Sequence, residues 1–128
     1  MRGPDDFELA LEDARRGRAE ALLQIASALF VANRDRLAEL TRRSRLPWAC
    51  EVRESVVAGC LFSYGPSVDA MYRRAPFYVD RILRGTKPGE LPIEQPARFE
   101  LALNLRTAKA LGLTIPQLVL SRADELIR

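Results

Sequence analysis

Residues 46–65 read LPWACEVRESVVAGCLFSYG and contain a strand, a short helix and a second strand. Leu46–Cys50 is a short apolar run with a proline near its beginning, where a strand tolerates the missing N–H. Arg53–Ala58 fits a short helix, and Cys60–Ser63 is the next apolar run, followed by a Gly-Pro turn signal. This order predicts two neighbouring parallel strands joined by a right-handed crossover.

The same alternation continues on both sides of this unit. Upstream we expect a helix from Pro4 to Gly17, a strand at Ala21–Ile25 that is buried on both faces, and an amphipathic helix at Phe30–Ser44. Downstream we expect a helix capped by Ser67 and running through Leu83, followed by an extended connection at 86–96. A half-buried strand at Phe99–Leu103, a helix from Asn104 to Leu111, and a last helix from Ile115 to the C-terminus should then follow.

These elements predict the α/β class, as a three-layer parallel sheet with helices on both faces. Only three strands precede the long helix. Such a sheet leaves large apolar areas uncovered, so the architecture is typical of one part of a larger fold.

The composition limits the classes of function. The chain has 128 residues, 48% of them hydrophobic, and a net charge of only +3, so it is sized for one domain with a real core. It contains no histidine, which removes the most common general base and metal ligand. Cys50 and Cys60 are too few for a zinc site. We therefore expect no enzyme, no metal and no cofactor.

The two cysteines are ten residues apart. The spacing favours two small buried thiols, with a disulfide only if their strands are neighbours in an oxidising compartment.

The apolar runs do not indicate a targeting or membrane segment. The opening residues MRGPDDF lack the apolar core of a signal peptide. Ile25–Ala32, among the longest apolar runs, is too short to span a membrane. The sequence alone therefore predicts a soluble chain without a signal peptide.

Two segments have a more specific pattern. They are residues 46–65, quoted above, and LPIEQP at 91–96 followed by FELALNLRTAKALGLTIP at 99–116. Together they closely resemble the C-terminal portion of bacterial ABC-transporter substrate-binding proteins related to the tryptophan-binding type. The family's Leu-Pro, Arg-Glu, Ala-Gly, Ser-Tyr-Gly and Tyr-Val-Asp-x-Ile-Leu-x-Gly motifs are matched at 46–47, 53–54, 58–59, 63–65 and 78–85.

The resemblance implies a periplasmic protein of two lobes that close on a small solute and deliver it to the membrane permease of an ABC transporter. Family members are much longer, so the chain resembles a C-terminal part. By this resemblance, residues 1–66 are βα units of the C-lobe, 67–90 are a helix and connection of the other lobe, and 91–128 are the hinge return strand and C-terminal helices of the C-lobe. The uncovered apolar surfaces predict a homodimer.

Ligands of open α/β sheets bind beyond the carboxyl ends of the strands. The candidate ligand-binding residues are Ser27 after the first predicted strand, Glu51 and Arg53 after the second, and Ser63 and Tyr64 after the third. Hydroxyl, guanidinium and aromatic groups suit an amino-acid-like or other small carboxylate solute. The resemblance implies an acidic residue in the turn that reads Ala26-Ser27-Ala28 here, and its loss weakens the case for amine recognition.

Each candidate also has a structural interpretation. Ser63 and Tyr64 could shape a hinge turn, and Glu51 and Arg53 could begin a helix. Trp48, within a strand, is more typical of a core residue than of a ligand platform.

Other functions fit less well. The clusters RRGR at 15–18, RRSR at 42–45 and RR at 73–74 suggest a nucleic-acid-binding module, but each lies on a helix end or outer face where arginine is normally solvated, so we expect no nucleic-acid partner. An enzyme with Ser63, Tyr64 or Cys60 as nucleophile would need a lysine for activation, and the sequence places Lys87 and Lys109 at the surface. A non-binding fragment that self-associates is the main alternative.

Overall fold

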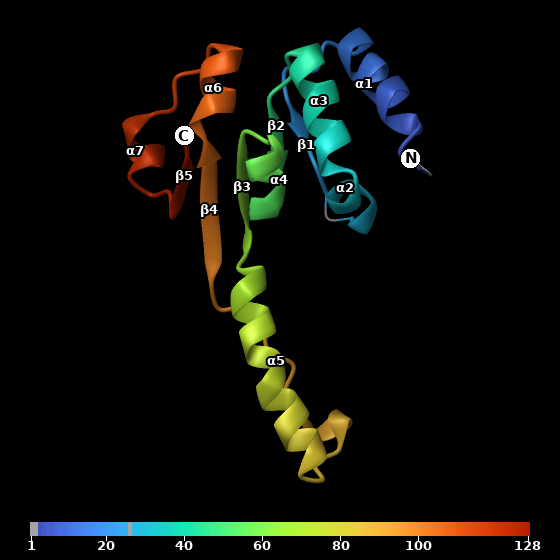
Figure 1. The fold of residues 1–128 in the computed structure, drawn as a ribbon, viewed down its shortest axis with the longest axis vertical. Helices are drawn as coiled ribbons and strands as arrows, with labels where there is room; N and C mark the ends of the chain where they lie inside the picture. The colour runs from blue at the N-terminus through green and yellow to red at the C-terminus, as the bar shows by residue number, and fades with distance from the viewer. Residues whose placement is uncertain (1–2, 26) are drawn as a thin grey trace. The chain divides into compact units, whose positions relative to one another are not determined.

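The computed structural model describes residues 3–25 and 27–128 and confirms the α/β class (Figure 1). Its helices are α1 (Asp6–Arg16), α2 (Ala28–Ala32), α3 (Arg34–Ser44), α4 (Arg53–Ala58), α5 (Val68–Leu83), α6 (Leu105–Leu111) and α7 (Gln117–Leu120), with a 3-10 turn at Pro88–Glu90. Its strands are β1 (Leu22–Leu23), β2 (Trp48–Cys50), β3 (Phe62–Pro66), β4 (Phe99–Asn104) and β5 (Glu125–Ile127).

The chain divides into two compact units. Unit 1 holds the described residues up to Gly65 together with Glu100–Arg128, and unit 2 holds Pro66–Phe99. Unit 1 therefore contains nearly all of the sheet, and unit 2 contains α5 and the segment that returns from it.

One sheet of five strands, in the order β1-β2-β3-β4-β5, is mostly parallel. β1, β2 and β3 are parallel neighbours, and β4 is parallel to β5. At one end of β4, Asn104 N donates to Leu61 O at 2.8 Å. Just before its other end, Ser67 N donates to Arg98 O at 2.9 Å, so β3 and β4 run in opposite directions.

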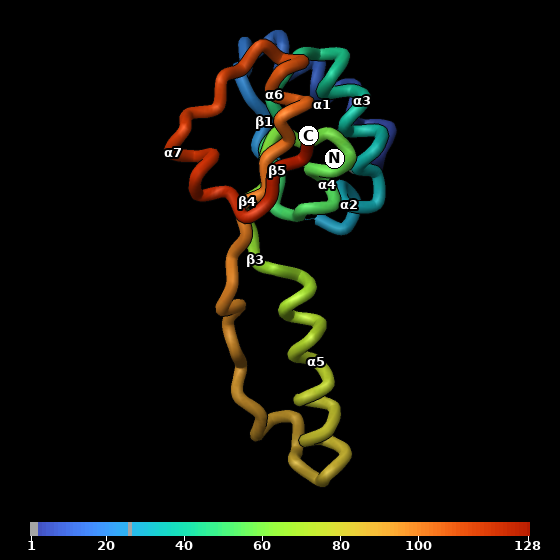
Figure 2. The backbone as a smooth tube through the Cα atoms, turned by 60° about the vertical axis from the view of Figure 1, so that its left-hand side comes forward, coloured from blue at the N-terminus to red at the C-terminus, as the bar shows by residue number. Residues whose placement is uncertain are grey.

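The core of unit 1 lies between the sheet and the helices α3 and α4. Trp48 is only 4% exposed and clusters with Ala38 of α3 and Val56 of α4. Helix α1 packs on α3, and the ring of its Phe7 lies 5.8 Å from that of Phe30 in α2. Figure 2 shows α2, α3 and α4 together on one side of the sheet and α7 on the opposite side. Trp48 is thus a core residue, as predicted.

Cys50 and Cys60 form a disulfide, so the expectation of two thiols is wrong. Cys50 ends β2 and Cys60 shortly precedes β3, the neighbouring strand, and their Cα atoms lie 6.4 Å apart. That separation is within the usual range for a disulfide. Both residues are buried, so the bond crosses the core.

Unit 2 consists of α5 and its return segment. As predicted, Ser67 caps the helix, and its side-chain oxygen accepts a hydrogen bond from Ala70 N at 3.4 Å. Arg74 donates through two nitrogens to the Glu94 carboxylate, at 2.9 and 2.7 Å. Within the described parts of the chain, no helix has the length and apolar character needed to cross a membrane.

The first predicted strand is much shorter and more exposed than expected. β1 spans two residues, and Leu23 is 80% exposed, so burial on both faces is wrong. The reason is position, because β1 is an edge strand of the sheet, with β2 as its neighbour.

Two helical expectations also need correction. The helix expected at 30–44 is two helices, α2 and α3, that meet at Asn33, whose side-chain amide donates to Leu29 O at 2.8 Å. The last helix does not reach the C-terminus, because α7 ends at Leu120 and β5 then pairs with β4, with Leu126 beside Leu103.

Candidate functional site

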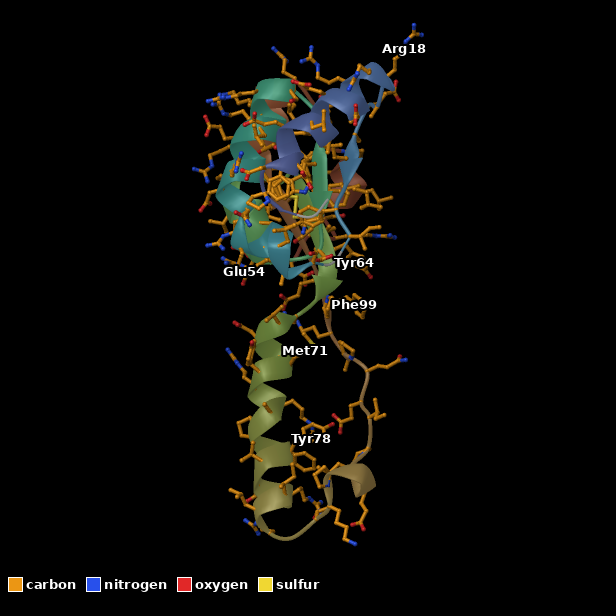
Figure 3. The ribbon with its side chains drawn as sticks, turned by 90° about the vertical axis from the view of Figure 1, so that its right-hand side faces the viewer. Arg18, Glu54, Tyr64, Met71, Tyr78 and Phe99 are labelled. Carbon is orange, nitrogen blue, oxygen red and sulfur yellow. A yellow bond between two sulfur atoms is a disulfide. The ribbon has the colours of Figure 1, made fainter. Side chains whose placement is uncertain are left out.

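The carboxyl ends of the parallel strands gather at one end of unit 1. Figure 3 shows Glu54, which follows β2, and Tyr64, which lies in β3, at this end, whereas Arg18, which precedes β1, lies at the opposite end. We refer to residues 24–25, 27–28, 51–54 and 62–65 as the strand-end surface. It is the candidate site, because open α/β sheets bind ligands there.

Ser27 lies at this end and caps α2. Its side-chain oxygen accepts a hydrogen bond from Leu29 N at 3.3 Å. The hydroxyl proton is free of that bond and can be donated elsewhere. Ala26, the first residue of the turn that lacks the family's acid, lies outside the described residues.

Glu51 meets the end of β3 through its backbone. A Cβ atom added at Gly65 would overlap the carbonyl oxygen of Glu51, so only glycine fits at this crossing. The close approach brings the β2–α4 turn beside the β3 segment that carries Tyr64. The contact is made on the face of β3 that carries Ser63 and Gly65, opposite to the face that carries Tyr64.

Arg53 begins α4 and forms an ion pair with Glu125 of β5. Its guanidinium contacts both carboxylate oxygens, with Nη2 at 2.6 Å from Oε1. Both side chains are partly solvent-accessible, so the pair stabilises the fold by no more than about 1 kcal/mol. The ion pair joins α4 to a strand that the sequence did not predict, so Arg53 is engaged within the fold.

Ser63 and Tyr64 point to opposite faces of the sheet, as consecutive strand residues do. Ser63 pairs with Cys50 in register and is only 2% exposed, on the face that carries the core. Tyr64 is 64% exposed on the other face. The structure therefore does not bring these two candidates together, and it offers only Tyr64 to a ligand.

An open apolar face accompanies Tyr64, and the sequence analysis missed it. Leu23, Ala49 and Phe62 are register partners across β1, β2 and β3 and therefore share a face. Phe62 is 37% exposed, and Tyr64, two residues further along β3, lies on the same face. Successive side chains of a strand point to opposite faces, so this alternation within each short apolar run was the signal that could have revealed the open apolar face.

The acidic side chains of the described residues do not form a metal centre. No group of three or more aspartates, glutamates or cysteines is placed to hold a metal ion within 3–25 and 27–128. The strand-end surface instead combines hydroxyl, carboxylate, guanidinium and aromatic groups around an apolar patch.

An open α/β sheet with mixed polar and aromatic groups at its strand ends defines a general class of ligand-binding domain. The family model described as ABC transporter substrate binding protein matches residues 5–127. The chain therefore belongs to the ABC transporter substrate-binding protein family.

Solved structures share this fold at low sequence identity. A conserved domain protein from Vibrio cholerae O1 biovar eltor is 21% identical with a TM-score of 0.90, and the match covers 98% of this chain and 42% of that one. An ABC domain from Streptococcus pneumonia, solved in complex with L-Trp, is 18% identical with a TM-score of 0.88, covering 99% and 44%.

A third structure is more distant. It is the ligand-free, open form of a substrate binding protein with adhesive properties from Clostridium difficile, 15% identical with a TM-score of 0.64, covering 96% of this chain and 41% of that one. No curated protein matches the chain. The chain thus spans less than half the length of the solved structures it resembles.

Proposed function

We propose that this chain provides one wall of the solute-binding site of an ABC importer, and that the solute is amino-acid-like or another small carboxylate. The match of the family model to residues 5–127 is the observation that chiefly supports this function. The solute class is supported by the chemistry of the strand-end surface, where an apolar and aromatic face adjoins groups that bind charged ends.

Each residue has a role in this proposal. The ring of Tyr64 covers the apolar body of the solute, Ser27 donates its hydroxyl proton to a carboxylate, and Glu51 accepts from an amine. Arg53 binds the solute carboxylate by exchanging it for Glu125, its partner in the fold. Ser63, buried on the opposite face, positions β3 rather than touching the solute.

The proposed setting is the periplasm, with a membrane permease as the partner that accepts the solute. The Cys50–Cys60 disulfide supports an oxidising compartment, because such bonds persist there and are rare in the cytosol. The proposed role is binding and release without chemistry, so the chain is not an enzyme. Because the chain spans 41–44% of the matched structures, the opposite wall would come from the part of that architecture outside it.

Titration calorimetry with L-tryptophan tests the proposal, with indole-3-propionate as a carboxylate probe that lacks the amine. We expect saturable heat, and Tyr64→Ala should weaken binding about tenfold or more, because the variant removes a large aromatic contact. Leu9→Ala, at an exposed position on α1, is the matched control and should bind normally. The proposal fails if neither compound, nor other aromatic amino acids, produces heat with a folded chain.

A second candidate, a non-binding homodimer, is favoured by the exposed apolar side chains of Leu23 and Ile25 at the end of the sheet. Edge strands with such side chains are templates for association. Light scattering at micromolar concentration distinguishes the two. If the Leu23→Lys variant is still a dimer, the dimer does not form through this edge of the sheet. If the wild-type chain is a monomer, the homodimer hypothesis is wrong.

A further inference from the structure

A groove of about 720 Å³ lies between α3, α6 and the C-terminal end of α4, all within unit 1. This volume is in the usual range for small-molecule sites. Asn104, the last residue of β4, donates its N–H to Leu61 O just before β3, so α6 starts beside the amino ends of the parallel strands. Figure 1 shows α6 and the C-terminal end of α3 at this end of unit 1. The groove therefore shares no residue with the strand-end surface.

The walls of the groove are fixed to one another by hydrogen bonds and close packing. Asn104 Nδ2 donates to Val56 O at 2.8 Å, and Thr107 Oγ1 donates to Gly59 O at 3.1 Å, which joins the start of α6 to the end of α4. A Cβ atom added at Gly59 would lie only 3.0 Å from Ala38 Cβ, so α4 also packs tightly on α3. The polar groups of the floor are thus satisfied within the fold.

Three arginines line the groove without partners of their own. They are Arg42 near the end of α3, Arg45 just after it, and Arg106 in α6. All three are exposed, and none of their guanidinium groups takes part in an ion pair or side-chain hydrogen bond within 3–25 and 27–128. Each guanidinium carries five N–H donors and no acceptor, so the groove offers uncommitted donors to an anion.

Arg45 is also held in a backbone conformation that side chains rarely adopt. Its φ of 53° lies in the left-handed region, at the end of a helix where glycine is the usual residue. Such strain in a residue other than glycine is costly and is concentrated at functional sites. Arg18 has a similar φ of 56° but does not line the groove. Strain and an unpaired guanidinium in the groove therefore coincide at Arg45.

The charge of the lining favours a dianion. Glu39 lines the groove but is paired with Arg43, which lies outside it. Asp35 offsets one of the three guanidinium charges, so an excess of two positive charges remains. A phosphate monoester carries about 1.5 to 2 negative charges near neutral pH, and its oxygens accept paired hydrogen bonds from arginine. A monocarboxylate carries a single charge and matches this excess less well.

We propose that this groove binds a small organic phosphate monoester. Its phosphate group accepts hydrogen bonds from the three groove arginines, its organic part contacts Val57 and Leu111, and Asp35 accepts a hydrogen bond from one of its hydroxyl groups. The site is separate from the one proposed for the solute, because it lies at the other end of the strands and takes a ligand of different charge.

Glycerol 3-phosphate is the probe, and titration calorimetry of the full chain is the readout. We expect saturable heat, with a Kd roughly in the millimolar range or tighter for so small a ligand. Glycerate, which has a carboxylate in place of the phosphate, should bind at least about tenfold more weakly. Arg45→Gly should weaken binding of glycerol 3-phosphate by about tenfold, because it removes one guanidinium. The same change relieves the left-handed strain, so the melting temperature should not fall.

Two control variants locate the effect. Arg18→Gly makes the same exchange at the other left-handed arginine and should leave the affinity for glycerol 3-phosphate unchanged. Tyr64→Ala, which tests the solute site, should also leave it unchanged, so the two proposals fail separately.

A lipid headgroup could supply the same phosphate monoester. Vesicles of phosphatidylcholine with phosphatidic acid distinguish the two sources. Sedimentation of the chain with these vesicles, without binding of glycerol 3-phosphate, would assign the groove to the lipid headgroup. The inference is overturned if the folded chain binds neither, if glycerate binds as tightly as glycerol 3-phosphate, or if Arg45→Gly binds the phosphate monoester as tightly as the wild type.

Discussion

Unit 1 and unit 2 are each stabilised by a different kind of side-chain contact. Unit 1 encloses a core in which Phe7, Val56 and Cys60 are at most 1% exposed. In unit 2, none of the 16 residues of α5 is buried, and its side chains make exposed contacts such as the Arg74–Glu94 pair, the hydrogen bond from Tyr78 Oη to Pro92 O, and the stacking of Arg74 on the Phe77 ring. A core of packed side chains stabilises far more than exposed ion pairs do.

Both units carry exposed apolar side chains, but only unit 1 also has a buried core. Apolar side chains of α5 such as Val79 and Leu83 remain exposed, together with Ile93 in the return segment. Figure 3 shows the side chains of Met71 and Tyr78 directed from α5 toward that segment, with which they line an open groove. Unit 2 therefore has apolar surface without a core, and unit 1 has both.

The largest expected effect is loss of a core side chain in unit 1. Phe7→Ala should destabilise the chain by about 3–5 kcal/mol, because it removes a buried ring and leaves a cavity. Tyr72→Ala, at an exposed position on α5, should change stability by less than about 0.5 kcal/mol. Urea unfolding followed by circular dichroism measures both. Equal losses would show that α5 is as firmly packed as α1.

Reduction of the disulfide should have the next largest effect. The bond closes a loop with a sequence separation of 10, which corresponds to about 2–3 kcal/mol of stability in the chain-entropy model. Dithiothreitol should lower the urea midpoint of the wild type. The double variant Cys50→Ala, Cys60→Ala should already have the lower midpoint and should not respond to the reductant. A wild-type midpoint unaffected by complete reduction would contradict the expectation.

Gly65→Ala should follow, with a loss of about 1–3 kcal/mol from steric overlap. The added Cβ would overlap the backbone of Glu51, which cannot rotate away as a side chain could. Gly89→Ala in unit 2 is the control, since nothing lies within 4 Å of a Cβ there. Similar stability of the Gly65→Ala and Gly89→Ala variants would show that Gly65 does not pack tightly against the backbone of Glu51.

The smallest effect concerns pH and unit 2. The hydrogen bonds from Arg74 lower the pKa of Glu94. Because the folded-state pKa is below the unfolded one, the stabilisation is present above the unfolded pKa and is lost as pH falls through the folded value. Acidification below the ordinary glutamate range should therefore reduce α5 helicity slightly. Glu94→Gln should remove that part of the pH dependence, and an unchanged profile would exclude the pair as its source.

Local signals predicted several elements closely. Helices α4 and α6 end at Gly59 and Gly112, and Asn104 caps α6 by accepting from Thr107 N at 3.0 Å. Ser67 caps α5 in the same way. Capping depends on residues a few positions apart, so the sequence carries the signal directly.

Features that depend on distant partners could not be predicted. Glu125–Ile127 forms a strand only because β4 provides the neighbouring edge, and Arg53 finds its partner Glu125 seventy-two positions along the chain. The exposure of Leu23 follows from the sheet ending at β1. At the candidate site, the positions of the strand ends could be predicted from the sequence. The face on which each side chain lies could not, because it depends on the strand register, which places Ser63 and Tyr64 on opposite faces.

Native-state amide hydrogen exchange tests the difference between the two units most directly. We predict that amides of β2, β4 and α4 exchange only by global unfolding, whereas amides of α5 exchange through local opening at a much lower free energy. Addition of a saturating solute should slow exchange in the strand-end surface. Protection of α5 equal to that of β2 in the free chain would contradict the account.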